Sequence, residues 1–313
     1  MIMRVQNAVV VAVALLVALP AFAQDRRGSE ETERVSRKFK IGAAGRLALS
    51  NISGNIVVMA GAGDEVALEA VKRTRGARSE LSTVVIDIDE RPGRVDIRTR
   101  HTGRRDRASV DYTVTVPRDA TVDLSSVSGD VRVSNLHGAL RAQSISGAVV
   151  ASGSTNVESA RSISGDVELS GSAPEARLAA STVSGTVRAR DVTARSVSVS
   201  AISGNVDISA VEAERLEAKT VSGDVIFAGT IARNGRYELN THSGNARLTL
   251  AAAPGFELNA NTFSGKIQSD LPVTVNDVRS RRGSGRSTRA VVGDGGATLT
   301  VSTFSGDVVI RRQ

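Results

Sequence analysis

A short motif built on Ser-Gly recurs along most of this 313-residue chain and constrains its fold more than any other feature. In the copy at 220–225, Thr-Val-Ser-Gly-Asp-Val, a hydrophobic residue, Ser-Gly, a small polar residue and a second hydrophobic residue follow one another. The glycines of the ten copies are Gly54, Gly129, Gly147, Gly165, Gly185, Gly204, Gly223, Gly244, Gly265 and Gly306. From Gly129 to Gly265 they are 18, 18, 20, 19, 19, 21 and 21 residues apart. A fixed period of about 20 residues predicts a stacked repeat array.

Alignment of the copies on the glycine separates buried from exposed positions. Seven and five residues before it most copies are apolar, as Leu216 and Ala218 are, with Glu158 an exception. Two residues after it they are again apolar, as Val225 is, and polar residues lie between. This alternation predicts two strands, each with one buried face, joined at a glycine corner that tolerates φ > 0. We expect the serine before the glycine, such as Ser222, to hydrogen-bond the corner backbone.

Two strands and a return in each repeat predict an all-β fold, a right-handed parallel β-helix with coils of about 19 residues and a β-rich N-terminal cap. Coils stack about 4.8 Å apart, so equal positions form columns along the axis. The chain has no six-residue period, which a left-handed hexapeptide helix requires, and propeller blades take about 40 residues. The hand rests on the general crossover preference. Val149, Val167 and Val187 should therefore be neighbours on adjacent parallel strands.

The N-terminus is typical of a secretory signal peptide over residues 1–23. Arg4 supplies the positive charge, residues 8–19 the apolar core and Ala21-Phe22-Ala23 the cleavage site. The core is shorter than the roughly 20 residues that a membrane-spanning helix needs. We therefore expect cleavage, no transmembrane segment afterwards, and a periplasmic or secreted, cell-surface protein. The chain contains no cysteine, so an exported fold must rely on stacked burial rather than disulfides.

The Ser-Gly-Asp-Val copies behind this export signal resemble the bacterial putative-adhesin family of β-strand repeats, a domain-of-unknown-function group. The resemblance covers roughly residues 45–313. It implies a β-helical exported protein with an adhesin role. The family supplies no agreed catalytic residues, so none are carried over to this chain. Residues 55–128 and 270–300 depart from the repeat.

Composition shifts divide the remaining chain into three parts. Residues 24–45 are charged and aperiodic at their start, which predicts a flexible leader. Residues 46–121 hold the first repeat and then alternating runs without a Ser-Gly corner, either degenerate coils or a hairpin sheet. We expect a sheet that caps the helix, because solenoid ends must protect their exposed edge. Residues 122–313 form the repeat array, interrupted by a Gly/Ser-rich basic loop at 274–290.

The formal net charge of +7 is unevenly placed. Residues 124–270 carry 13 basic and 14 acidic residues, so the basic excess lies outside the regular array. The loop offers a candidate anion-binding group for envelope polyanions: Arg279, Arg281, Arg282, Arg286 and Arg289. The alternative is a solvated loop that blunts the solenoid end. Nucleic acid is not expected, because an exported chain with few aromatic residues has little to stack on bases.

Asp or Asn follows many of the corner glycines, an arrangement that a calcium ladder would use. Ala148, Thr186 and Lys266 interrupt this column, and Asp and Asn are ordinary corner residues. Calcium-binding β-rolls use a nine-residue Gly/Asp repeat that this chain lacks. We therefore expect neither a metal site nor a cofactor.

Carboxylates on the outer faces come closest to a catalytic arrangement. Asp166 lies two residues from Glu168, and Glu217 and Glu238 occupy equal positions in neighbouring copies. Polysaccharide-cleaving enzymes use paired carboxylates, but two per patch on a surface rich in both charges predicts solvated side chains. We expect a non-catalytic putative adhesin or envelope-interaction module that binds envelope polyanions, glycans or another envelope protein. A carbohydrate-active enzyme and a periplasmic structural or regulatory partner are the alternatives.

Overall fold

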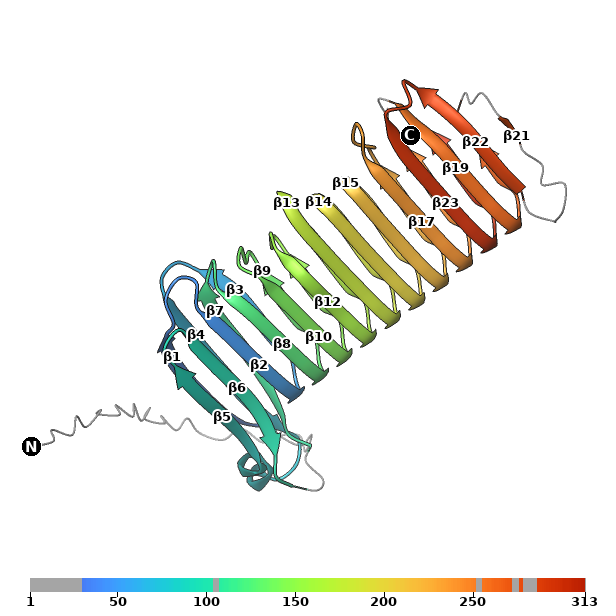
Figure 1. Cartoon of the computed structure of the whole chain (residues 1–313). Coiled ribbons are helices and arrows are strands. Elements are labelled where there is room, and N and C mark those ends of the chain that lie inside the picture. Colours follow the sequence, from blue (N-terminus) through green and yellow to red (C-terminus); the bar gives the residue numbers. More distant parts are fainter. Residues whose placement is uncertain (1–29, 104–106, 252–254, 272–275, 278–285, 313) are drawn as a thin grey trace, which may run out of the picture.

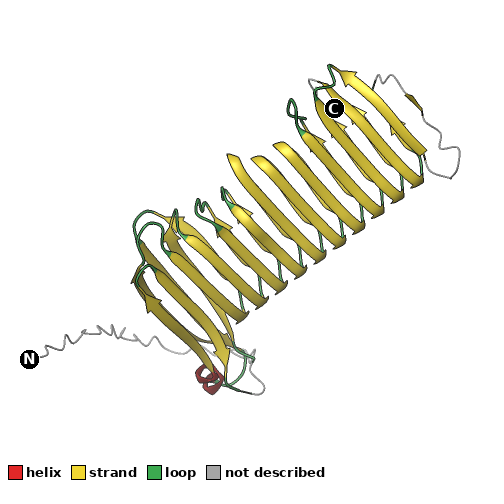
Figure 2. Ribbon diagram, in the orientation of Figure 1, coloured by secondary structure: helices red, strands yellow, loops and turns green. Residues whose placement is uncertain are grey.

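The structure is a computed structural model, which describes residues 30–103, 107–251, 255–271, 276–277 and 286–312. Within these residues the chain is all-β apart from a short 3-10 helix, η1 (Arg78–Thr83), and forms an elongated, mostly parallel solenoid (Figures 1 and 2). The predicted signal peptide at 1–23 lies outside the described residues. None of the helices in the described part has the length and apolar character needed to span a bilayer.

Each coil contributes one strand before its corner glycine and one after it, so the stack has two rows of strands. The row before the corner runs β5 (Val84–Arg91), β6 (Arg94–His101), β2 (Arg46–Ser53), β8 (Thr121–Ser128), β10 (Leu140–Ser146), β12 (Val157–Ser164), the second parts of β13 (Val167–Ser184), β14 (Val187–Ser203) and β15 (Val206–Ser222), β17 (Arg236–Ser243), β23 (Ala297–Ser305), β19 (Gly255–Ser264), β22 (Arg286–Gly293) and β21 (Asn276–Asp277). The row after it runs β1 (Glu31–Lys40), β4 (Glu65–Thr74), β7 (Ser109–Pro117), β3 (Ile56–Gly61), β9 (Val131–Ser134), β11 (Val149–Ser152), the first parts of β13 to β15, β16 (Val225–Gly229), β18 (Ala246–Leu250), β24 (Val308–Arg312) and β20 (Ile267–Ser269).

Equal positions of successive coils face one another, as the repeat predicts. Val149 pairs with Val167 and Val167 with Val187 on parallel strands, and all three are fully buried. The interior is one continuous core of Val, Ile, Leu and Ala, with larger rings toward both ends, such as Tyr112 and Tyr237. Burial of these columns is the main stabilising term, since each large apolar side chain contributes roughly 1.5–3 kcal/mol.

The corner is held by a column of hydroxyls three residues before the glycine, which bond to a neighbouring coil in seven of the ten copies, while Asn51 and Ala201 occupy the position in two others. Thr220 donates its hydroxyl to the carbonyl oxygen of Gly204 in the preceding coil, at 2.8 Å. The same bond recurs from Ser144, Ser162, Thr182, Thr241, Thr262 and Thr303. Ser222 and the other serines directly before the glycines are exposed, except Ser53, which is half-buried. The role expected of the serine column therefore belongs to the buried hydroxyl column two residues earlier.

The expected flexible leader at 24–45 is wrong over its described part. Glu31–Lys40 form β1, which pairs along its whole length with β4 in antiparallel fashion. Backbone groups make this pairing, so a charged composition does not prevent it, and the charged side chains stay largely in solvent. Val35 packs against the core and Phe39 is buried in it, and these two apolar residues dock the strand.

Antiparallel strands cover both rows at the N-terminal end and the row before the corner at the C-terminal end, with the terminal repeats inside. At the N-terminal end β6 and β7 form a further coil beside β2 and β3, while β5, β4 and β1 run antiparallel and cover the edge, so both alternatives for residues 55–121 occur together. At the C-terminal end the last repeat, β23 and β24, lies between β17/β18 and β19/β20 (Figure 1). The predicted loop at 274–290 is wrong from Arg286 onward, because β22 pairs with β19.

Candidate functional site

Two residues before each corner glycine, every coil places a large side chain in solvent. We call this column the corner stripe, which in spatial order comprises Ile52, Val127, Ile145, Ile163, Val183, Ile202, Val221, His242, Phe304 and Phe263. Its nine hydrophobic members are between 38% exposed, at Ile52, and 51% exposed, at Ile202. The buried positions lie seven, five and three residues before the glycine, so a residue two before it is out of phase and must face outward.

The C-terminal end of the stripe is aromatic. The rings of His242 and Phe304 stack with centroids 4.9 Å apart and planes 9° from parallel. Phe304 and Phe263 stack at 4.8 Å and 3°. These spacings match the separation of neighbouring strands, so the backbone itself sets the stack. Phe304 comes from β23, and its insertion between β17 and β19 completes the column. His242 therefore packs against Phe304 on the outer face.

A row of polar side chains runs beside the stripe, four residues before each glycine. It includes Ser125, Gln143, Arg161, Ser181, Ser200, Lys219, Asn240 and Ser302. Between the two rows lies a shallow groove, here the corner groove, with two stretches of about 560 and 600 Å³. One wall is apolar and the other mainly offers uncharged hydrogen-bonding groups. The groove can therefore bind a partner that has both apolar surface and hydroxyl or amide groups.

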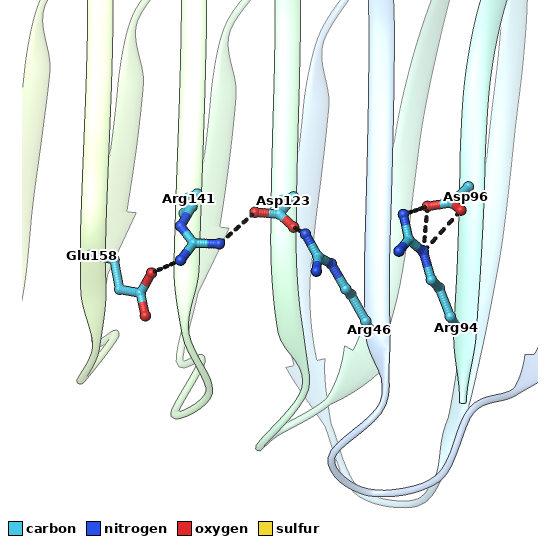
Figure 3. Close-up of polar contacts among 6 residues, drawn as sticks. All are labelled: Arg46, Arg94, Asp96, Asp123, Arg141 and Glu158. Carbon is cyan, nitrogen blue, oxygen red and sulfur yellow. Dashed lines mark hydrogen bonds and ion pairs between the residues drawn. The ribbon is translucent and has the colours of Figure 1, made fainter. Parts of the chain in front are cut away.

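Farther from the corner, the same outer face carries charges that neutralise one another across the coils in its N-terminal half. Figure 3 shows Asp123 between Arg46 and Arg141, with Arg141 also paired to Glu158. Glu158 points outward because a bulge places Val157 in the buried position opposite Leu140. Alternating signs on adjacent strands stabilise the sheet, and these groups are already partnered within the protein.

Three of the four carboxylates considered for catalysis, Asp166, Glu217 and Glu238, are engaged in the same way. Asp166 accepts hydrogen bonds from the Thr186 backbone N–H, at 2.8 Å, and from Arg188, at 2.6 Å. The Thr186 bond is the main cause that holds the pKa of Asp166 below its usual value, with Arg188 assisting. A catalytic acid at neutral pH needs a raised pKa, so this environment opposes that role. Glu217 and Glu238 both lie beside Lys219.

The side chains of the Asp and Asn residues after the corner glycines accept hydrogen bonds from backbone N–H groups. Asp224 accepts a hydrogen bond from the backbone N–H of Asn245, at 2.8 Å, and Asn245 accepts one from the N–H of Asp307, at 2.9 Å. The same side-chain-to-backbone bond runs from coil to coil elsewhere in the stack. The described residues contain no group of three or more His, Cys, Asp or Glu side chains arranged to hold a metal ion.

The candidate anion-binding arginines are only partly within the described chain. Arg279, Arg281 and Arg282 lie outside the described residues. Arg286 and Arg289 are exposed on β22, opposite Thr262 and Asn259 of β19. Residues three apart on a strand point to opposite sides of a sheet, so the structure does not bring these two together.

Residues 45–311 match the sequence profile of the Toastrack DUF4097 family. The chain belongs to this family. No curated protein matches this Toastrack chain. Among solved structures it is similar to a putative adhesin from Bacteroides fragilis, at 12% identity and a TM-score of 0.44, over 89% of this chain and 97% of that one. A putative adhesin from Parabacteroides distasonis matches at 11% identity and a TM-score of 0.40, over 90% and 97%. A putative lipid binding protein from the same species matches at 12% and 0.31, over 92% and 98%.

The corner stripe of this Toastrack chain was not predicted from the sequence, although the repeated motif contains the pattern that indicates it. The hydrophobic residue of the motif, such as Val221, sits an odd number of positions from the buried residues Leu216 and Ala218. Strict alternation therefore assigns it to the outer face, where an apolar side chain has no packing role. An out-of-phase hydrophobic residue that recurs in nine of the ten copies is the available evidence for a contact surface.

Proposed function

We propose that this Toastrack chain is a non-catalytic, exported surface-interaction module of the adhesin type, which binds cell-envelope glycans along the corner groove. The observation that carries the proposal is the corner stripe. Soluble proteins rarely leave a long contiguous apolar surface in water without a partner. Ten coils that each add one large side chain in the same place form such a surface.

The shape of the groove favours an elongated polymer. Coils repeat about every 4.8 Å, so ten of them present a straight surface on the order of 40 Å long. Glycans combine apolar C–H surface with many hydroxyls, which suits an apolar wall facing a wall of Ser, Gln and Asn side chains. Arg161 adds a positive charge to the polar wall, which favours sugars that carry acidic groups, whereas Lys219 is paired with Glu217 and Glu238.

Three sequence predictions form part of the proposal: export by the signal at 1–23, the right-handed sense of the solenoid and a coil of about 19 residues. Export would place the groove next to envelope glycans. Sequencing the N-terminus of the protein recovered from the host envelope tests the signal, since cleavage after Ala23 would leave Gln24 first.

Binding of the purified mature chain to cell-wall and envelope glycans tests the function. The variant Ile163→Ser/Ile202→Ser removes two side chains that are 49% and 51% exposed. Loss of their contact area should weaken glycan binding about tenfold or more, while the melting temperature stays nearly unchanged. The matched control is Met59→Ser/Val291→Ser, which changes residues 43% and 52% exposed that lie outside the stripe.

If the two double variants bind glycan with equal affinity, the corner stripe is not the contact surface. A wild-type chain that binds no envelope glycan would overturn the proposed function. If the chain retains an envelope protein and no glycan, the partner is a protein. Turnover of a polysaccharide would contradict the non-catalytic assignment.

A further inference from the structure

A second hollow lies on the outer face, at the other end of the strands that carry the corner stripe. It has a volume of about 810 Å³, and we call it the arginine hollow, after Arg177, Arg195, Arg215 and Arg236 in its lining. Arg215 and Val221 are both on β15 and six residues apart, which places the two regions roughly 20 Å apart along the strand. The hollow is therefore separate from the corner groove.

The register of the coils gathers these arginines from separate repeats. Arg177 pairs with Ser196, Ser196 with Arg215, and Arg215 with Arg236, so the four residues form one column across four strands. Arg215 and Arg236 face each other directly. Two like charges at paired positions destabilise a sheet, and nothing in the packing of the coils requires them there.

Among the described residues, three of the four arginines in the arginine hollow have no internal counter-charge, although Glu214 also lines it. Arg195 lies 3.6 Å from both Glu175 and Glu214. Within the described part of the chain, no carboxylate lies at ion-pair distance from Arg177, Arg215 or Arg236. At the N-terminal end of the same face, by contrast, Arg46 and Arg141 pair with Asp123 and Glu158 on neighbouring strands, and Arg94 pairs with Asp96 on its own strand (Figure 3).

We propose that the arginine hollow binds a phosphate-bearing anion. Guanidinium groups match the oxygens of a phosphate in pairs, and three unpaired ones around one concave surface can contact several oxygens together. Ser196 and Asn234 line the same hollow and add neutral donors. A free phosphate and the phosphate of a lipid headgroup share this chemistry. This proposal involves none of the corner-stripe residues, so it is independent of the proposed glycan binding.

The test uses the full mature chain with two probes, inorganic phosphate and vesicles that contain either phosphatidylglycerol or only phosphatidylcholine. The variant Arg215→Gln/Arg236→Gln removes the facing pair. The control Arg34→Gln/Arg37→Gln removes the same charge from exposed residues of β1, at the opposite end of the solenoid. Affinity is measured by calorimetry and vesicle sedimentation, and thermal melting with and without phosphate shows whether binding stabilises the fold.

We expect the hollow variant to bind at least tenfold more weakly than the wild type and the control to bind as the wild type does. The variant should melt at the same or a higher temperature without phosphate, because a repulsive pair is gone, and phosphate should no longer raise it. Binding only to phosphatidylglycerol vesicles identifies a lipid headgroup, and binding of inorganic phosphate alone identifies a soluble anion. Absence of wild-type binding to both probes, or equal loss in the control, overturns the proposal.

Discussion

Replacement of Gly223 by alanine should destabilise the solenoid at a single corner. Gly223 has φ +153°, and a Cβ built on it would lie 2.1 Å from the carbonyl oxygen of Gly204 in the neighbouring coil. The backbone strain costs about 1–3 kcal/mol for a non-glycine residue. Relief of the contact moves the Gly204 carbonyl by more than about 1 Å, which disrupts the bonds Thr220–Gly204 and Gly204–Ser222 at about 1 kcal/mol each. The total is about 3–5 kcal/mol.

Gly229 provides the matched control, because it lies in the same coil on β16. An alanine Cβ there would meet its nearest atom, the carbonyl oxygen of Val211, at 3.4 Å, which is ordinary contact. Gly229→Ala should leave the free energy of unfolding nearly unchanged or raise it by up to about 1 kcal/mol, since alanine restricts the unfolded chain.

Urea unfolding followed by circular dichroism measures both variants. Repeat arrays can unfold in parts, so amide hydrogen exchange on the coils around residues 204 and 223 should accompany the global measurement. We expect exchange to accelerate in these coils in Gly223→Ala alone. If the unfolding midpoints of Gly223→Ala and Gly229→Ala coincide, the argument that the corner excludes a side chain is refuted.

Three further predictions concern hydrogen bonds and protonation. Thr220→Val keeps the shape but leaves the Gly204 carbonyl without its hydroxyl partner, so urea unfolding should show a loss of about 1–3 kcal/mol; no loss would contradict the hydroxyl column. Burial raises the pKa of Tyr112 to about 12 and also raises the pKa of Tyr237, so phenolate absorbance should stay low at pH 10. The free energy of unfolding should fall between about pH 10 and 12, because only the tyrosines of the unfolded chain ionise there. Ionisation of the folded tyrosines near pH 10 would contradict their burial. The lowered pKa of Asp166 makes Asp166→Asn less stable than wild type at neutral pH, a gap that should close as pH falls through the folded pKa of Asp166; a gap independent of pH would refute the linkage.

Part of the candidate site could be read from the sequence, and part could not. The position and recurrence of Val221 and its counterparts are visible in the motif, and their outward direction follows from alternation with Leu216. The arginine hollow could not be predicted from the sequence, because residues 124–270 are nearly neutral in total charge. Arg177 and Arg236 are 59 positions apart in the chain, and only the register of four strands brings them into one column.

The sequence alone determined the repeat unit: two alternating strands, a glycine corner and columns such as Val149, Val167 and Val187. These features depend on neighbours within one period, where local geometry and side-chain pattern agree. Tertiary structure decided the order of the end coils, which places β23 between β17 and β19 and aligns His242, Phe304 and Phe263. Copies with the same pattern can stack on one another in any order, so the pattern cannot specify which copy is whose neighbour. Protection of the end edges by β1, β5 and β22 then selects one arrangement, because it pairs backbone groups that a sequential stack would leave exposed.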